Sequence, residues 1–202
     1  MTGGVEKVVL ATNNPKKLIE LRRVVRDAGL AVEVLGLGDF DPYPEPAETE
    51  RTFEGNAFIK AEAAARYTGL PALADDSGLE VDELNSMPGV RSARWAGPEC
   101  NDAANNALLL AQLAGVPTKR RGARFVCALA LVLPDGGRQL WREEMPGRIA
   151  EEERGDGGFG YDPLFLPDGR ACTSAELTTA QKDAISHRGK AVRAFVAWLK
   201  EQ

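Results

Sequence analysis

The order of apolar and polar residues predicts alternating strands and helices from the start of the chain. Residues 5–11 (VEKVVLA) form a short apolar run rich in β-branched side chains, which is typical of a strand. Apolar residues then recur at helical spacing from Leu18 through Leu21 and Val25 to Ala28, and Gly29 follows as a stop signal. We therefore expect a strand, a turn and a helix in this order.

The remainder of the chain continues this alternation. Residues 36–51 hold three prolines and five acids, and we expect them to form a mobile loop. The last part of the pattern includes an antiparallel hairpin, so the fold class predicted is α/β with a mixed sheet. The further elements expected are helices at 52–68, at 101–113 and from Gly189 onward, strands at 71–74, 124–133 and 138–144, and a short apolar segment at 79–84.

Length and composition favour one globular domain over residues 1–202. The chain is 44% hydrophobic and 27% charged, which is enough to bury a substantial core. It has no apolar run near the ~18 residues that span a bilayer, and it starts without a signal-peptide pattern. Its three cysteines lack a CxxC spacing, so we expect reduced thiols in a cytoplasmic protein with no membrane partner.

The charge of the chain argues against binding to nucleic acid. The net charge is −5 and no Lys/Arg run is present, whereas affinity for a phosphate backbone depends on a basic patch. Any anionic ligand must therefore meet a local cluster of cations.

Two adjacent carboxylates, Asp75 and Asp76, follow the apolar run 70–74 and precede a Ser-Gly pair. Neighbouring carboxylates repel each other, and a half-buried pair needs a cation, hydrogen bonds or a shared proton. A divalent metal would satisfy this need. An Asp-Asp-Ser-Gly stretch is also typical of a plain turn, and the dipeptide alone favours the turn.

Three further stretches could bind a nucleotide. TNNPKK, residues 12–17, lies where a strand should lead into a helix, so it predicts either a phosphate site or an ordinary helix cap, and it lacks the spacing of a P-loop. GDGGFGYDP, residues 155–163, combines four glycines with two aromatic residues, which suits a flat base but also a surface turn. AQKDAISHRGKA, residues 180–191, groups the only histidine with several cations that could bind carbonyl or phosphate oxygens; a purely structural histidine is the alternative. A serine hydrolase is disfavoured because Ser77 has no partner base nearby in sequence.

Together these motifs resemble the inosine triphosphate pyrophosphatase family, also described by dITP and XTP pyrophosphatase activity. The matching segments, in order, are TNNPKKLIEL, TFEGNAFIKA, LADDSGLEVDELNSMPGVRSARWAG, GGFGYDPLF and AELTTAQKDAISHRGKA. The resemblance implies hydrolysis of non-canonical purine triphosphates (ITP, dITP, XTP) to the monophosphate and pyrophosphate, which cleanses the nucleotide pool. It also implies an elongated mixed β-sheet with flanking helices, two lobes with the active-site cleft between them, and a homodimer.

The resemblance also implies roles for particular residues. Asp76 is implied as the catalytic proton acceptor, and Mg²⁺ is implied as the cofactor, held by Glu48, Asp75 and Asp76, with Glu45 and Glu54 as substitutes for Glu48. Asn13 stands where a typical member has glycine, a change that left-handed geometry tolerates in asparagine. The substrate-binding residues implied are Thr12, Asn13, Asn14, Pro15, Lys16, Lys17 and Lys60 for the triphosphate, and Ser77, Phe159, Gly160, Tyr161, Asp162, Lys182, His187 and Arg188 for the base and nearby groups.

Two alternatives remain beside this interpretation. One is a nucleotide sensor that binds without turnover, which the retained carboxylates Glu48, Asp75 and Asp76 disfavour. The other is the septum-inhibitor type of nucleotide pyrophosphatase, which prefers pyrimidines and is disfavoured by a Ser-His-Arg segment suited to a purine carbonyl.

Overall fold

The computed structural model describes residues 5–202, which divide into two compact units. Among the described residues, unit 1 comprises 5–76, 127–142 and 190–202, and unit 2 comprises 77–126 and 143–189. Three strands and one helix have residues in both units, because the boundaries fall within β3, β5, β6 and α5. The boundary in β3 separates Asp76 from Ser77.

Unit 1 contains the start of the chain and its last helix. Its elements are β1 (Lys7–Leu10), α1 (Pro15–Asp27), β2 (Glu33–Gly36), the 3-10 turn η1 (Leu37–Asp39), α2 (Phe53–Thr68), the first half of β3 (Ala72–Val81), the second half of β5 (Gly122–Val132), the start of β6 (Arg138–Ile149) and most of α5 (His187–Leu199).

Unit 2 is built from the middle of the chain. Besides the remaining parts of β3, β5 and β6, its elements are η2 (Asp82–Leu84), β4 (Met87–Pro88), η3 (Gly89–Arg94), α3 (Asp102–Gln112), η4 (Thr118–Arg120), β7 (Phe165–Pro167), η5 (Ser174–Glu176) and α4 (Thr179–Ile185).

The strands are hydrogen-bonded in the order β2-β1-β3-β5-β6-β7, with β4 beside β3. β1 runs parallel to β2 and to β3, with Leu10 opposite Leu73, whereas the β3–β4 and β6–β7 pairs are antiparallel. The predicted mixed α/β sheet is therefore confirmed. Because β1 and β3 are parallel, the residues after Leu10 and the residues after Leu73 extend towards the same edge of the sheet.

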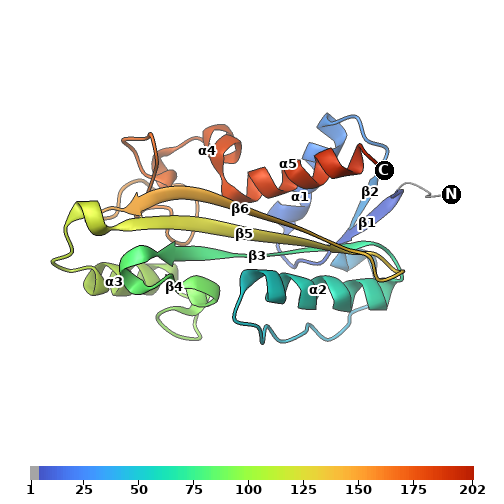
Figure 1. Cartoon of the computed structure of the whole chain (residues 1–202), viewed down its shortest axis with the longest axis horizontal. Coiled ribbons are helices and arrows are strands. Elements are labelled where there is room, and N and C mark those ends of the chain that lie inside the picture. The colour runs from blue at the N-terminus through green and yellow to red at the C-terminus, as the bar shows by residue number, and fades with distance from the viewer. Residues whose placement is uncertain (1–4) are drawn as a thin grey trace. The chain divides into compact units, whose positions relative to one another are not determined.

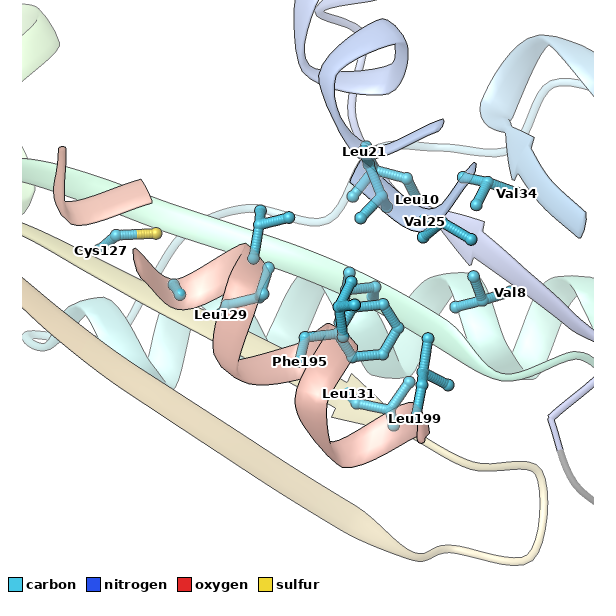
Figure 2. Close-up of a cluster of buried hydrophobic side chains, with 14 residues drawn as sticks. Val8, Leu10, Leu21, Val25, Val34, Cys127, Leu129, Leu131, Phe195 and Leu199 are labelled. Atoms are coloured by element: carbon cyan, nitrogen blue, oxygen red, sulfur yellow. The ribbon is translucent and has the colours of Figure 1, made fainter. Parts of the chain in front are cut away.

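Helices cover both faces of the unit 1 strands (Figure 1). On one face, Leu21 of α1 and Phe195 of α5 join the strand residues Leu10 and Leu131 in a cluster of fully buried side chains (Figure 2). Figure 1 shows α2 on the other face, and three of its alanines, Ala57, Ala61 and Ala64, are fully buried. Small side chains let this helix backbone approach the sheet closely.

Unit 2 has a separate hydrophobic cluster. Leu79 of β3, Leu109 of α3, Phe125 of β5 and Ile149 of β6 are buried in it together with Phe165. The edge-tilted rings of Phe125 and Phe165 lie 4.6 Å apart between centroids. Tyr161 of the glycine-rich stretch 155–163 belongs to this cluster, and Ile185 at the end of α4 packs against it.

The predicted helices agree well with the structure because their ends carry strong local signals. Asn14, Thr52 and Asn101 each cap the helix that follows, with a side-chain oxygen accepting a backbone N–H. Gly69 ends α2 in the left-handed conformation, with φ of 68°. The last helix begins at His187, two residues before the predicted Gly189.

The predicted turn after Ala74 is wrong. β3 runs without interruption from Ala72 to Val81 and joins the strand expected at 71–74 to the segment expected at 79–84. Asp75 and Asp76 are thus interior residues of a strand. The turn prediction rested on the preferences of neighbouring residues for turns. These preferences take no account of Lys17 and Lys60, which lie on helices next to the strand and neutralise the two carboxylates.

Replacing Phe195 by alanine tests the unit 1 core. Phe195 is fully buried, so Phe195→Ala should lower the free energy of unfolding by about 3–5 kcal/mol in urea denaturation. Phe159→Ala is the matched control, since Phe159 is exposed and its loss should change stability by no more than about 0.5 kcal/mol. Equal effects of the two substitutions would contradict this packing.

Candidate active site

The TNNPKK stretch forms the N-terminus of α1. The Asn14 Oδ1 atom accepts the N–H of Lys16 at 3.0 Å, and the Asn14 N–H donates to Thr12 Oγ1 at 3.2 Å, while Pro15 occupies the first turn. Asn13 Nδ2 donates to Glu45 Oε2 at 3.3 Å. The cap interpretation is therefore correct, and it leaves the positive end of a helix at this edge of the sheet, where an anion is favoured.

Lys17 joins this helix to the carboxylate pair. Its Nζ atom lies 2.6 Å from Asp75 Oδ2, and Asp75 is only 4% exposed. The parallel pairing of β1 and β3 explains the contact, because α1 starts directly beyond the end of β1, next to the Asp75 segment of β3. A buried carboxylate of this kind needs a paired cation, which Lys17 supplies.

Asp76 is neutralised from a different helix. Lys60 Nζ of α2 lies 3.7 Å from Asp76 Oδ1 and 2.8 Å from Glu48 Oε1. Successive strand residues point to opposite faces of a sheet, and α1 and α2 cover opposite faces of β3 (Figure 1). The charges of the two neighbouring aspartates are thus compensated by contacts with different lysines.

The charge state of Lys60 follows from these contacts. Burial lowers the pKa of Lys60, but the charges of Asp76, Glu48 and Asp75 and the hydrogen bond to Glu48 more than offset it, and the pKa is raised overall. Lys60 therefore keeps its positive charge at neutral pH and links Glu48 of the acidic loop (residues 36–51) to the middle of α2.

Of the three glutamates considered as partners of Asp76, Glu48 shares Lys60 with it. Glu54 instead lies 2.9 Å from Arg142, and Glu45 accepts from Asn13. Within residues 5–202, no three His, Cys, Asp or Glu side chains are gathered closely enough to enclose a metal ion. The oxygen donors of Glu48 and Asp76 are instead held together by an ammonium group.

In unit 2, the glycine-rich loop is organised around Asp162, which is 2% exposed. Its Oδ2 atom accepts the N–H of Phe159 at 2.8 Å and also accepts from Lys182 Nζ. Lys182 Nζ in turn lies 4.9 Å from the centroid of the Phe159 ring. Gly158 has a positive φ of 77°, and a Cβ there would collide with the Asp162 carboxylate.

The two aromatic residues of this loop have different environments. Phe159 is 73% exposed, whereas Tyr161 is 4% exposed and its hydroxyl donates to the Ser92 carbonyl at 2.8 Å. Burial, with the nearby charge of Asp102, raises the pKa of Tyr161, so the phenol stays a donor. Of the two, Phe159 presents its ring to solvent, whereas Tyr161 anchors the loop in the core.

Sequence reasoning missed the residues that hold this loop and the acidic loop in place. Asp102 Oδ2 accepts the N–H of Gly160 at 2.7 Å, and Asn106 Nδ2 donates to the Gly160 carbonyl at 3.2 Å. The available signal was their four-residue spacing, which puts both on one side of α3. Asn56 of α2 was missed as well, because a single asparagine in an alanine-rich helix carries no pattern of its own.

His187 and Arg188 begin α5, which follows the capping residue Ser186. The His187 ring stacks on Phe125, with centroids 5.1 Å apart and an interplanar angle of 11°. Ser77, the residue after Asp76, is half-buried in β3. The sequence-predicted residues thus form two groups: those from Thr12 to Asp76 lie in unit 1 and those from Ser77 to Arg188 lie in unit 2.

The fold and these side chains define a mixed α/β protein with lysine–carboxylate pairs beside a helix N-terminus. The model of the Ham1 family matches residues 8–198, and the chain belongs to this family. The family resemblance expected from the sequence is therefore confirmed. No helix among residues 5–202 is both long and apolar enough to cross a bilayer.

The relatives of known name support the same assignment. The chain is 60% identical over 188 residues to the dITP/XTP pyrophosphatase of Nocardia farcinica, covering 93% of this chain and 91% of the relative. It is 56% identical over 197 residues to that of Mycobacterium tuberculosis strain H37Rv, covering 97% and 96%.

Solved structures agree with the fold. The Mycobacterium abscessus nucleoside-triphosphatase / dITP/XTP pyrophosphatase matches with a TM-score of 0.82 at 53% identity, over 94% of this chain and 97% of that one. A HAM1 protein from Coxiella burnetii matches with a TM-score of 0.91 at 41% identity, over 97% and 99%.

Removing the charge of Asp162 tests its central place in the glycine-rich loop. Asp162→Asn leaves the Lys182 ammonium without its buried anion, so the free energy of unfolding should fall by about 3 kcal/mol. Asp156→Asn, the same change at an exposed position of this loop, should change it by less than about 0.5 kcal/mol. If both variants unfold at the wild-type urea midpoint, Asp162 does not organise the loop.

Proposed function

We propose that this chain hydrolyses non-canonical purine nucleoside triphosphates, namely ITP, dITP and XTP, to the monophosphate and pyrophosphate. This activity removes deaminated bases from the nucleotide pool before they enter DNA or RNA. The names of the relatives support the substrate class. The observation that carries the chemistry is the contact of the Lys60 ammonium with both Glu48 and Asp76.

The triphosphate is bound by unit 1. The N-terminus of α1, formed by Thr12, Asn13, Asn14 and Pro15, supplies backbone N–H groups and a positive dipole end. Lys16, Lys17 and Lys60 supply the local cations that a chain of net charge −5 needs in order to hold a polyanion. Asp75 orients Lys17 through their 2.6 Å contact.

The donor set fits Mg²⁺. Glu48 and Asp76 offer hard oxygen ligands with no histidine or cysteine beside them, and the ammonium of Lys60 shows that a positive charge is favoured at these two carboxylates. We propose that Glu48 and Asp76 hold the metal, and that Asp75, which the family resemblance also implied as a ligand, mainly holds Lys17. When bound there, Mg²⁺ would neutralise phosphate charge and acidify water. Asp76 accepts the proton of the water that attacks the α-phosphorus, and pyrophosphate is the leaving group.

The base is read by unit 2. Phe159 and the Gly160 backbone form its platform, with Tyr161 and Asp162 holding that platform in place, and Ser77 contributes a hydroxyl. Lys182, His187 and Arg188 supply hydrogen-bond donors. Hypoxanthine and xanthine carry an acceptor oxygen at position 6, whereas adenine carries a donor there, so adenine leaves donors unpaired at about 1–3 kcal/mol each.

We further propose a cytoplasmic homodimer. The cysteines Cys100, Cys127 and Cys172 are free thiols, which suits a reducing compartment. The dimer is the arrangement implied by the family resemblance, and sedimentation of the purified chain measures it directly.

Pyrophosphate release with and without metal tests the proposed reaction. The protein should release pyrophosphate from ITP, dITP and XTP with Mg²⁺ present, and far less from ATP. Excess EDTA should abolish turnover, and added Mg²⁺ should restore it. Full activity in EDTA, or binding of ITP without any turnover, would rule out this proposal, and the second result would identify a nucleotide sensor.

Base selection is tested at Arg188. Arg188→Ala should reduce the ITP to ATP ratio of kcat/KM by ~10- to 100-fold, since one donor that pairs with the oxygen at position 6 is lost. The Mg²⁺ concentration giving half-maximal rate should stay unchanged. Arg193→Ala, on the same helix at an exposed position, is the control and should keep the wild-type ratio. A wild-type ratio in Arg188→Ala would assign base reading elsewhere.

A further inference from the structure

Asn56 is the polar side chain most completely enclosed beside Asp76, with an exposed fraction of 1%. It lies in the first turns of α2 and uses both ends of its amide. Its Nδ2 atom donates to Asp76 Oδ2 at 3.2 Å, and its Oδ1 atom accepts the N–H of Glu50 at 3.0 Å. One side chain therefore connects the carboxylate of β3 to the backbone of the acidic loop.

Asn56 acts together with Lys60, one helical turn further along α2. Lys60 Nζ lies near Asp76 Oδ1, and Asn56 Nδ2 donates to Asp76 Oδ2, so side chains of α2 contact both oxygens of the same carboxylate. The same two residues hold the acidic loop at Glu48 and at Glu50. This pairing restricts rotation of the Asp76 carboxylate and keeps Glu48 beside it.

Asparagine suits this position because it must donate and accept at once. An aspartate would keep the acceptor for the Glu50 N–H but would place a second carboxylate against Asp76. A leucine would leave both the Glu50 N–H and Asp76 Oδ2 without this partner inside the protein, which is costly for buried polar groups.

We infer that Asn56 is a positioning residue for the hydrolytic reaction, acting through Asp76 by fixing the orientation of its carboxylate. This inference rests on the proposed function, in which Asp76 accepts the proton of water. The Asn56 amide bonds to Asp76 and to the Glu50 N–H, not to the N-terminus of α1 or to the base-reading residues of unit 2, so its loss should lower kcat and leave KM nearly unchanged. Loss of supporting hydrogen bonds of this kind typically reduces activity ~10- to 100-fold.

A double-mutant cycle tests this inference with Asn56→Asp, Asp76→Asn and the combined variant. Asn56→Asp should lower kcat for ITP by ~10- to 100-fold with KM within about threefold of wild type. In the Asp76→Asn background, the same substitution should change kcat by less than about threefold, because the group it positions has already been removed.

Thermal unfolding without added metal supplies a second readout of the same contact. Asn56→Asp should lower Tm by placing two carboxylates together. The combined variant has a carboxylate at position 56 and an amide at position 76, so one donor again faces one acceptor. It should recover most of the Tm lost in Asn56→Asp. Thr52→Ala is the control, since it removes the cap of α2 at Gly55 (3.1 Å) and should lower Tm without a selective loss of kcat.

Specific outcomes would overturn the inference. A kcat for Asn56→Asp within threefold of wild type, or an equal fold-loss in both backgrounds, would show that Asn56 has no role through Asp76. If wild type releases no pyrophosphate from any of the triphosphates while the Tm coupling persists, the contact is real but the proposed function is wrong, and the catalytic role of Asn56 falls with it.

Discussion

The structure depends on neutralising two adjacent carboxylates inside a continuous strand. Asp75 and Asp76 stay in β3 because strand geometry sends them to opposite faces, where Lys17 of α1 and Lys60 of α2 meet them. Without these cations, burial of Asp75 would favour either protonation or departure of the chain from the sheet. Helices α1 and α2 are thereby both tied to one point in the sheet, and the acidic loop is held there too because Glu48 shares Lys60.

This electrostatic arrangement also links the two ligands of the proposed reaction. Lys17 and Lys60 are the counter-ions of the carboxylates here, and they are also the cations assigned to the triphosphate. When phosphate oxygens attract these ammonium groups, the carboxylates lose part of their compensation, and a divalent cation becomes more favourable beside Glu48 and Asp76. Binding of nucleotide and metal is therefore expected to be mutually favourable, since each relieves the charge imbalance that the other creates.

The sequence was informative where structure is determined locally. Helix α2 was predicted to within one residue because Thr52 and Gly69 mark its ends. Strands β2 and β7 were missed because they have only four and three residues, which is too short for an alternation of apolar and polar residues to be recognised. The turn predicted at Asp-Asp-Ser-Gly was wrong for a different reason. Whether this stretch stays in the strand depends on Lys17, 58 residues before Asp75, and on Lys60, 16 residues before Asp76, and turn preferences consider only residues that are neighbours in sequence.

The same limit explains the candidate site. The motif resemblance placed Phe159, Tyr161 and Asp162 in one group. The structure shows three different environments: the Phe159 ring is exposed, the Tyr161 ring is buried and anchors the loop, and Asp162 is a buried charge. Asp162 repeats in unit 2 the device seen in unit 1, a carboxylate inside the protein that holds a lysine, here Lys182. Such pairs add little net stability, because desolvation offsets their attraction, and their main effect is to fix where the ammonium group lies. An orienting role explains why both units place these pairs beside the residues assigned to the nucleotide: a lysine held by a buried anion is already positioned for a ligand, whereas a solvated lysine would first have to lose its side-chain freedom.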